Sequence, residues 1–483
     1  MALKRLAAFF AVLWLFFLSE FAAAQASRWV DVGLSGGSGK ARIVSPAEIL
    51  VADDGSYTAR IRFSSSSYDF MLVNGEKVLP VSTEGGSVFE IPVPSLSCSV
   101  EVQADTLAMS QPHLIDYTIV FGESARQEET AAPAGDVNAD LPDELIYTGS
   151  MKLKYASCFT VDDYEGGLSL ITIGGKDRYL LIPENGTVPQ NLPADITVLQ
   201  QPLSRIYIAA TDAMDMFSAC GAMQNLRFSS QRQEGWYISD AVEAMQSGSL
   251  VFAGKYSAPD YELLLSQGCD LAIENTMIYH VPKAKEELQA IGIPVLVETA
   301  SNEPTPQGRM EWVRLIGLLT GHSEAAERAF ERQISAMEQY SAETDTMKTV
   351  AFFYMSQEGH ICVRSSTDFI SQMIRMAGGK PISFDNGEKS ASTLNIQMEA
   401  FYAAARNADY LIYNSTTGSV LNSLEDLYAL SPLFRDFAAA ECKQVYCTEK
   451  NFFQSSMELG DIVTELHNML TENEDFHFLR RLP

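Results

Sequence analysis

Four short apolar runs in the middle of the chain constrain its fold more than any other feature. They are RIYIAA (205–210), SLVFAG (249–254), DLAIEN (270–275) and IPVLVE (293–298). Each is followed by a polar turn or by a segment of helical period, such as 260–266 or 283–290. Strands that are buried on both faces and alternate with helices form a parallel sheet covered by helices. The runs therefore predict an α/β lobe, which we place at residues 146–305.

A second set of apolar runs predicts a second lobe at residues 344–483. Its members are TVAFFYM (349–355), ADYLIYN (408–414) and KQVYC (443–447). Between the two sets, apolar residues recur at helical spacing with a kink expected at Gly321-His322: Trp312, Leu315, Ile316, Leu319, Ala326, Phe330, Ile334 and Met337. We expect one long interlobe helix at 306–343, because a helix of that length spans about 45 Å at 1.5 Å per residue.

The N-terminal part has a different texture. Apolar and polar residues alternate in short runs, as in Tyr57, Ala59, Ile61 and Phe63, and Gly and Asn residues separate the runs. Period-two alternation with such punctuation is typical of an antiparallel β-sandwich, which we place at residues 27–122. The next segment, 123–145, is rich in Ala, Pro, Asp and Glu and lacks apolar periodicity, so we expect a linker there.

The first 26 residues resemble a secretory signal. Lys4 and Arg5 precede an apolar run at 6–18, and small residues follow at Ala22, Ala23, Ala24 and Ala26. This order is typical of a cleaved signal peptide, so we expect export to the cell surface, the periplasm or the extracellular space. An uncleaved segment that tethers the chain to a membrane is the alternative. No cysteine closely follows the apolar run, so a lipid-modified N-terminal cysteine is not indicated.

Composition narrows the function classes. The formal net charge of -28 argues against nucleic acid and anionic membrane surfaces as partners, because both need a basic footprint. The seven cysteines are scattered without a CxxC pair, so they indicate neither a disulfide framework nor a zinc site. Cys442 and Cys447 flank a predicted strand, and whether they pair stays open.

Motifs of catalysis are missing from the sequence. There is no G-x-S-x-G, no HExxH and no P-loop, and the glycine-rich stretch 33–40 precedes a predicted sandwich rather than a helix. The six histidines do not cluster. We therefore assign no catalytic residue, no metal site and no intrinsic cofactor, and we expect a binding protein rather than an enzyme.

Ligands of parallel α/β sheets bind beyond the carboxyl ends of the strands. Applied to the predicted strands, this rule selects a candidate cleft: Thr211, Asp212, Lys255, Tyr256, Glu274, Asn275, Thr276, Met277, Arg309, Arg364, Ser365, Asn414 and Lys450. Arg309, Arg364 and Lys450 would suit an anionic ligand such as a carboxylate-bearing chelate, because guanidinium groups bind carboxylates bidentately. Alternatively, each arginine braces local backbone or an adjacent aspartate.

Two α/β lobes joined by one long helix resemble the class III substrate-binding proteins of ABC importers for iron chelates, haem and cobalamin. Four blocks are similar to that family: GKYSAPDYELLLSQGCDLAIENTMIY, ASNEPTPQGRMEWVRLIGLLTG, ICVRSSTDFISQMIRMAGGKP and NIQMEAFYAAARNADYLIYN. The resemblance covers about residues 146–475. It implies a monomer that captures an iron chelate, haem or corrinoid, with an ABC permease and its ATPase as partners.

The resemblance also implies a role for two glutamates. In the family, one Glu on each lobe docks into arginine pockets of the permease, and the matching positions are Glu262 and Glu399. Two carboxylates on rigid helices would give register and a charge-steered encounter. Alternatively, each is a solvated helix residue.

The sandwich resembles the NEAT haem-binding domains in two segments, SSSSYDFMLVNG (64–75) and PHLIDYTIVF (112–121). The resemblance implies Ser66, Tyr68, His113 and Tyr117 as candidate haem contacts, with His113 and Tyr117 on one face of a strand. Ordinary core packing of Tyr117 is the alternative. A different functional class also stays open, namely a surface adhesion protein whose sandwich recognises a partner and whose two-lobed half senses another small molecule.

Overall fold

The structure is a computed structural model. It describes residues 26–30, 32–36, 43–44, 46–51, 56–63, 68–82, 87–106, 114–122, 141–142, 144–339, 346–356, 359–384, 392–472 and 476–483. These residues form two compact units, with the boundary between Val137 and Asn138. The signal-like segment, apart from its last residue, lies outside the described ranges, as do Ser66 and His113. None of the described helices is both long and apolar enough to cross a membrane.

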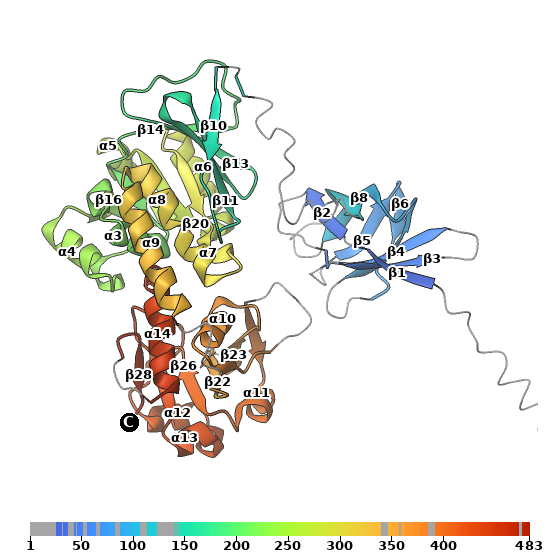
Figure 1. Cartoon of the computed structure of the whole chain (residues 1–483), viewed down its shortest axis with the longest axis vertical. Helices are drawn as coiled ribbons and strands as arrows, with labels where there is room; N and C mark the ends of the chain where they lie inside the picture. Colours follow the sequence, from blue (N-terminus) through green and yellow to red (C-terminus); the bar gives the residue numbers. More distant parts are fainter. Residues whose placement is uncertain are drawn as a thin grey trace, which may run out of the picture. The chain divides into compact units, whose positions relative to one another are not determined.

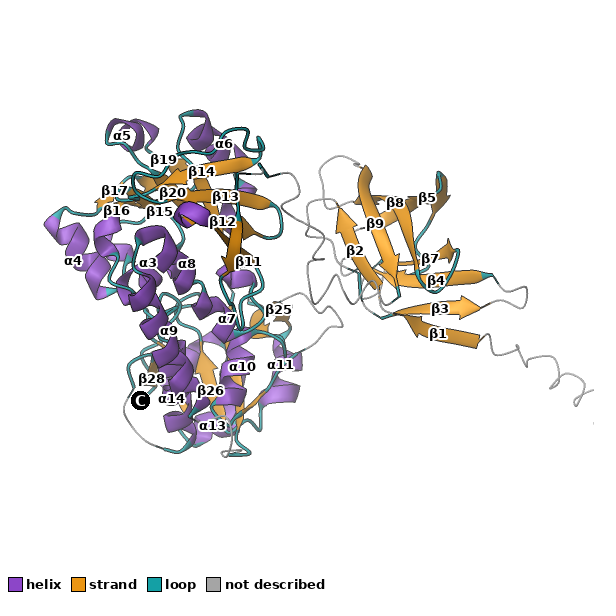
Figure 2. Cartoon of the chain, turned by 45° about the horizontal axis from the view of Figure 1, so that its top comes forward, coloured by secondary structure: helices purple, strands orange, loops and turns teal. Residues whose placement is uncertain are grey.

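The first unit consists of two antiparallel sheets (Figure 2). One has the order β1 (Ala26–Val30), β3 (Ala47–Val51), β4 (Tyr57–Arg62), β7 (Val88–Val93). The other has the order β2 (Val32–Gly36), β9 (Leu114–Phe121), β8 (Cys98–Thr106), β5 (Tyr68–Val73), β6 (Glu76–Val78). Buried side chains of both sheets, such as Ile61 and Ile119, form one core. This is the antiparallel arrangement that the alternation predicts; the likeness to NEAT domains stays a prediction.

The first lobe of the second unit contains a parallel sheet of order β17-β16-β15-β20-β21. Its strands are β15 (Ile206–Ile208), β16 (Leu226–Ser229), β17 (Val251–Phe252), β20 (Leu271–Asn275) and β21 (Val295–Glu298). Helices α3 (Thr211–Ala219), α4 (Ser239–Ser247), α5 (Tyr261–Ser266) and α6 (Pro282–Ala290) alternate with them, as does the hairpin β18 (Gly254–Lys255) and β19 (Ala258–Pro259). The four apolar runs form strands of this sheet, as predicted.

A second sheet in the same lobe was not predicted. It joins β10 (Tyr147–Ser150), β11 (Phe159–Tyr164), β12 (Leu168–Ile173), β13 (Asp177–Ile182) and β14 (Ile196–Gln200). The first four strands are antiparallel and β14 runs parallel to β13. Two buried carboxylates tie the segment after β10 to a distant helix: Glu303 accepts hydrogen bonds from the backbone of Ser157 and Cys158, and Glu311 from that of Lys154, Tyr155 and Ala156.

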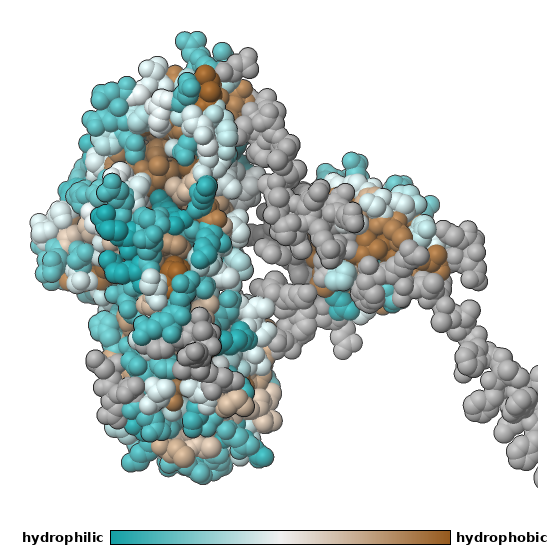
Figure 3. All heavy atoms as spheres, viewed as in Figure 1, coloured by the Kyte–Doolittle hydropathy of each residue, from teal (hydrophilic) through white to brown (hydrophobic). Residues whose placement is uncertain are grey.

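The interlobe segment is three helices, where one long helix was predicted. They are α7 (Pro306–Glu311), α8 (Val313–Thr320) and α9 (Ser323–Glu338). The predicted kink is present because Gly321 ends α8 in a left-handed conformation with φ of 76°. Trp312, between α7 and α8, keeps right-handed helical dihedrals, so the interruption at Gly321-His322 is what corrects the expected 45 Å rod. The outward face of α9 is charged, and Figure 3 shows the polar surface in this part of the second unit.

The second lobe is built on a mixed sheet, where the sequence predicted a parallel one. Its order is β25 (Thr393–Ile396), β23 (Ile361–Arg364), β22 (Thr349–Met355), β26 (Tyr410–Tyr413), β27 (Val445–Thr448) and β28 (Leu479–Arg481), with β24 (Lys380–Pro381) beside β22. Among the described strands of this sheet, β22, β24, β26 and β27 are those that pair in parallel. Its helices are α10 (Phe369–Met376), α11 (Met398–Ala405), α12 (Leu424–Leu430), α13 (Ala438–Glu441) and α14 (Leu459–Leu470). Cys442 and Cys447 are both free thiols, so they do not pair.

The two lobes share a continuous core along the interlobe helices. Helix α3 of the first lobe and α14 of the second both pack on α9 (Figure 1). Buried residues of the two lobes, such as Phe217 and Ile462, belong to one hydrophobic cluster with Ile334 of α9. This packing joins the two lobes along the interlobe helices.

Candidate ligand pocket between the two lobes

A cavity of about 610 Å³ lies between the lobes. The first lobe contributes α3 and the segment after β16, and the second lobe contributes the loop after β27 and the segment before β28. This is where the strand-end rule places ligands in α/β sheets. The lining residues are Asp215, Ser218, Tyr237, Ile238, Ser239, Glu449, Lys450, Asn451, Ser455, Glu458, Phe476 and His477.

The 449–458 loop of the second lobe is hydrogen-bonded to the first lobe along one wall of this cavity. Gln454 accepts a hydrogen bond from Tyr237 N at 2.8 Å and donates one to Gly235 O at 2.8 Å. Ser456 Oγ donates to Asp212 O at 2.6 Å. Met457 N donates to Asp215 Oδ2 at 2.7 Å. The lobes are therefore in contact beside the pocket, and these four hydrogen bonds must break if they separate there.

Burial sets the chemistry of the pocket wall. Asp215 is 7% exposed on a helix of mostly apolar residues. Desolvation raises the pKa of Asp215 to about 7, helped by the neighbouring carboxylates of Glu458 and Asp240. Across the pocket, the Lys450 ammonium lies 5.8 Å from the centre of the Tyr237 ring. Glu449 forms an ion pair with Arg480 at 3.2 Å.

A cluster of buried charges lies in the same interlobe region. Asp212 at the start of α3 lies close to Glu298 at the end of β21, and the two carboxyl groups interact electrostatically. Burial raises the pKa of both carboxyl groups, and that of Glu298 lies well above its ordinary value. Arg309 of α7 faces this pair and also Asp368 of the second lobe. The arginines of the cluster therefore lie close to buried carboxyl groups of the protein itself, and Arg309 Nη2 also donates a hydrogen bond to Ser301 O at 2.7 Å.

Aromatic rings close the other side of the charged cluster. Arg309 stacks on Phe369 with 4.0 Å between the guanidinium carbon and the ring centre. Arg364 at the end of β23 lies 5.6 Å from the ring of Phe453, which belongs to the 449–458 loop. Arg364 Nη1 also lies 3.7 Å from Asp368 Oδ2. The 449–458 loop lines the pocket and also places Phe453 beside Arg364 of the charged cluster. The pocket and the charged cluster therefore belong to a single interlobe surface.

The structure brings together only part of the predicted cleft. Lys450 lines the pocket, and Asp212, Arg309 and Arg364 form the charged cluster. The remaining residues have local structural roles or lie elsewhere: Thr211 begins α3, Lys255 and Tyr256 belong to the β18–β19 hairpin, Glu274 is fully buried, Asn275 caps Met277, Thr276 follows β20, and Ser365 and Asn414 are buried beside their own loops.

Tyr237, Asp215, Phe476 and His477 line the pocket but were not predicted. Tyr237 follows β16, whose sequence LRFS is too short and too polar to read as a buried strand. If that strand had been recognised, the strand-end rule would have selected the segment that follows Ser229, and this segment contains Tyr237. Asp215 had a detectable signal, since it is a carboxylate between Met214 and Met216 in the apolar part of α3. Nothing local marks Phe476 and His477, which reach the pocket through β28 pairing with β27.

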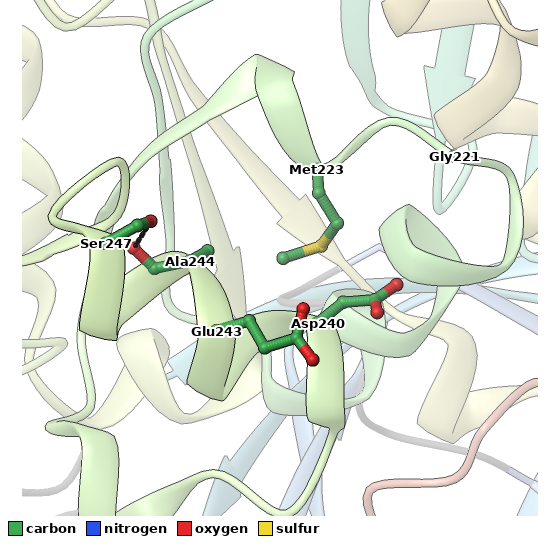
Figure 4. A pocket seen from close by; sticks show the side chains of 6 residues that line it. All are labelled: Gly221, Met223, Asp240, Glu243, Ala244 and Ser247. Carbon is green, nitrogen blue, oxygen red and sulfur yellow. Dashed lines mark hydrogen bonds between the residues drawn. The ribbon is translucent and has the colours of Figure 1, made fainter.

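A second hollow, of about 510 Å³, lies within the first lobe (Figure 4). The carboxylates of Asp240 and Glu243 on α4 lie near the thioether of Met223 there. Because residues of one lobe alone line this hollow, movement of the lobes cannot enclose a ligand in it. The interlobe cavity is therefore the better candidate site.

The two predicted docking glutamates are both exposed. Glu262 lies in the first turn of α5 in the first lobe, and Glu399 in the first turn of α11 in the second. Carboxylates at these positions also interact favourably with the helix dipole. The two helices lie at opposite ends of the second unit (Figure 1).

The sandwich tyrosines are core residues. Tyr68 Oη and Tyr117 Oη share a hydrogen bond of 3.0 Å, and the residues are 7% and 3% exposed. Burial raises the pKa of Tyr68. The arrangement favours the packing interpretation of Tyr117 over haem ligation, since neither phenol faces solvent.

Comparison with known proteins identifies the fold of the second unit. Residues 213–451 match the family described as periplasmic binding protein. An uncharacterised lipoprotein of Methanocaldococcus jannaschii is 23% identical over 318 residues, which are 62% of this chain and 78% of that protein. A periplasmic binding protein of Veillonella parvula is 12% identical with a TM-score of 0.48, covering 65% of this chain and 98% of its own. The periplasmic heme binding protein HutB of Vibrio cholerae is 19% identical with a TM-score of 0.44, covering 55% and 98%. The family match and the two α/β lobes of the structure together give the second unit the two-lobed periplasmic binding protein fold.

Proposed function

We propose that the chain is the extracytoplasmic substrate-binding component of an ABC importer, which captures an iron chelate, haem or a corrinoid between its lobes and delivers it to the permease. The observation that carries this proposal is the interlobe cavity, which is lined by residues of both lobes, eight of the twelve within the stretch 213–451 that matches periplasmic binding proteins. Its volume of about 610 Å³ is within the usual range of small-molecule sites. The ligand class follows from the sequence resemblance.

Capture works by lobe closure. A ligand that contacts Tyr237 of the first lobe and Lys450 or Asn451 of the second interacts with both walls only when the lobes are together. Such a ligand shifts the equilibrium toward the closed form by its differential affinity for the two forms. The core along α9 and α14 acts as the hinge, because it is continuous between the lobes.

Delivery uses Glu262 and Glu399. Each carboxylate is exposed near the start of a short helix, where basic pockets of a permease could reach it. Because the two glutamates are on different lobes, their separation changes when the lobes close. A permease with arginine pockets at a fixed spacing therefore distinguishes the closed, loaded form from the open form.

Ligand titration of the full chain tests the capture step. Trp236 precedes the pocket residue Tyr237, is 3% exposed, and donates its Nε1–H to Ser229 Oγ at 3.0 Å. Its fluorescence should therefore respond to occupation of the pocket. We expect saturable quenching with at least one of hemin, cyanocobalamin and a ferric chelate, and weaker binding after Tyr237→Ala. Absence of a saturable signal with all three would remove the metal-complex assignment.

Uptake measurements test the delivery step. We expect Glu262→Ala and Glu399→Ala to abolish transport by the cognate importer without changing ligand affinity. Glu286→Ala is a matched control, because Glu286 is exposed on α6 of the first lobe and has no proposed role. Normal uptake by both docking variants, or a loss of affinity in either, would refute the docking role.

A further inference from the structure

The interlobe pocket carries more negative than positive charge. Among its described lining residues, Asp215, Glu449 and Glu458 are acidic, whereas Lys450 is the one lysine or arginine. Arg480 compensates Glu449 at 3.2 Å, but nothing among the described residues pairs with Glu458 in this way. An anion entering this pocket would therefore meet the unpaired Glu458 carboxylate and Asp215, whose raised pKa of about 7 leaves it partly charged at neutral pH, against one ammonium.

The arginines nearby do not reverse this balance. Arg309 and Arg364 were expected to attract an anionic ligand, but three carboxyl groups surround them: Asp212, Glu298 and Asp368. Arg364 lies 3.7 Å from Asp368, and Arg309 faces the carboxyl groups of Asp212 and Glu298. The guanidinium charges are therefore used within the protein and leave no surplus for an anion.

Two further observations indicate a cation. Asp215 is 7% exposed, its Oδ2 accepts from Met457 N, and its Oδ1 has no hydrogen bond to the described residues. The pocket also has an aromatic ring from each lobe, Tyr237 and Phe476. The Lys450 ammonium already lies 5.8 Å from the Tyr237 ring centre, at the edge of the range for a cation–π contact. A ring and carboxylates around one cavity form an environment that favours a positively charged group.

We propose that the interlobe pocket selects metal complexes that carry a positively charged group, such as a ferric chelate with a free ammonium, over anionic complexes of the same class. This inference rests on the proposed function and specifies its ligand. In the bound state, the ligand's cationic group takes the place of the Lys450 ammonium over Tyr237, and Asp215 and Glu458 supply the opposite charge. The selectivity is electrostatic, so it weakens as salt increases.

A matched pair of iron complexes tests the inference on the full chain. Ferrioxamine B is a ferric trihydroxamate with a free ammonium group, and its N-acetyl derivative has the same iron centre without that charge. We expect ferrioxamine B to bind roughly tenfold more tightly, which is within the range of a desolvated cation–π contact. The preference should shrink in 0.5 M salt. A ferric triscatecholate, which is an anion, should bind most weakly.

Three variants localise the effect. Glu458→Gln should reduce the preference for ferrioxamine B over its acetylated form, whereas Glu286→Gln, outside the pocket, should not. Lys450→Met removes the competing ammonium and should tighten ferrioxamine B binding. Equal binding of the two trihydroxamates, tighter binding of the triscatecholate, or weaker ferrioxamine B binding by Lys450→Met would each overturn the charge inference and leave the proposed function intact. If no metal complex of any charge binds, both proposals fail together.

Discussion

The guanidinium of Arg309 lies over the ring of Phe369, 4.0 Å from its centre, and this contact joins the two lobes. Arg309 belongs to α7, at the end of the first lobe, and Phe369 is the first residue of α10 in the second. Gln372, one turn later in α10, donates a hydrogen bond to Pro304 O at 2.5 Å. The start of α10 therefore holds the lobes together on the side of the charged cluster.

Loss of the Phe369 ring should favour the open form. Phe369→Leu keeps an apolar side chain but removes a cation–π contact of about 1 kcal/mol, which corresponds to a roughly fivefold shift in the equilibrium between closed and open forms. A larger radius of gyration in solution scattering would report the change. Tyr428→Leu is the control, because Arg435 stacks on Tyr428 at 4.2 Å within the second lobe alone. Identical scattering of Phe369→Leu and the native protein would show that the stack does not hold the lobes together.

Stability of the second unit should depend on the charge of Glu274. This residue is the next to last of β20 and is fully buried, and neither of its carboxylate oxygens has a hydrogen-bond partner among the described residues. Burial raises its pKa from 4.5 to about 8, and the phenols of Tyr207 and Tyr261 lie nearby. The folded state therefore binds a proton that the unfolded state releases above pH 4.5. Stability consequently falls as pH rises from 4.5 to 8.

Glu274→Gln removes that pH dependence. The shift is worth on the order of 4 kcal/mol at pH 8, since one pKa unit is about 1.36 kcal/mol. We expect the variant to melt at a higher temperature than the native protein at pH 8 and at a similar temperature at pH 4.5, measured by calorimetry. Glu262→Gln, an exposed carboxylate on α5, should not change the pH dependence. Parallel pH profiles for Glu274→Gln and the native protein would contradict the burial argument.

Prediction from sequence succeeded for elements whose structure depends mainly on their own residues. The run DLAIEN is apolar enough to specify a buried strand, and Gly321 alone specifies a left-handed helix end. It failed where distant segments decide. Arg309 looks like a free cation in sequence, and only the fold reveals that Asp212, Glu298 and Asp368, from three separate elements, face it. The backbone of residues 154–158 likewise donates hydrogen bonds to carboxylates about 150 residues away. The position of this segment beside α7 therefore could not be predicted from its own sequence.

Glu311 should be a major stabilising residue of the second unit. Its buried carboxylate accepts hydrogen bonds from the backbone of Lys154, Tyr155 and Ala156 and forms an ion pair with Arg314 at 2.8 Å. Glu311→Ala leaves these donors unsatisfied, and we expect a loss of about 3 to 5 kcal/mol in the free energy of unfolding. Urea denaturation measures it, with Glu331→Ala on the exposed face of α9 as the control. A loss below about 1 kcal/mol would mean that water replaces the carboxylate.

The buried tyrosine pair decides between packing and haem ligation in the sandwich. Tyr117→Phe removes one of two phenols that share a hydrogen bond of 3.0 Å, so we expect a loss of about 1 kcal/mol in the stability of the first unit. Because Tyr117 is 3% exposed, we also expect the full chain to bind the same amount of hemin before and after the substitution, measured from the Soret band. Tyr57→Phe, a partly buried tyrosine of β4, is the control for removal of a phenol. If Tyr117→Phe alone lowers the amount of bound hemin, the phenol must reach the iron, and the sandwich then has to open for haem to enter.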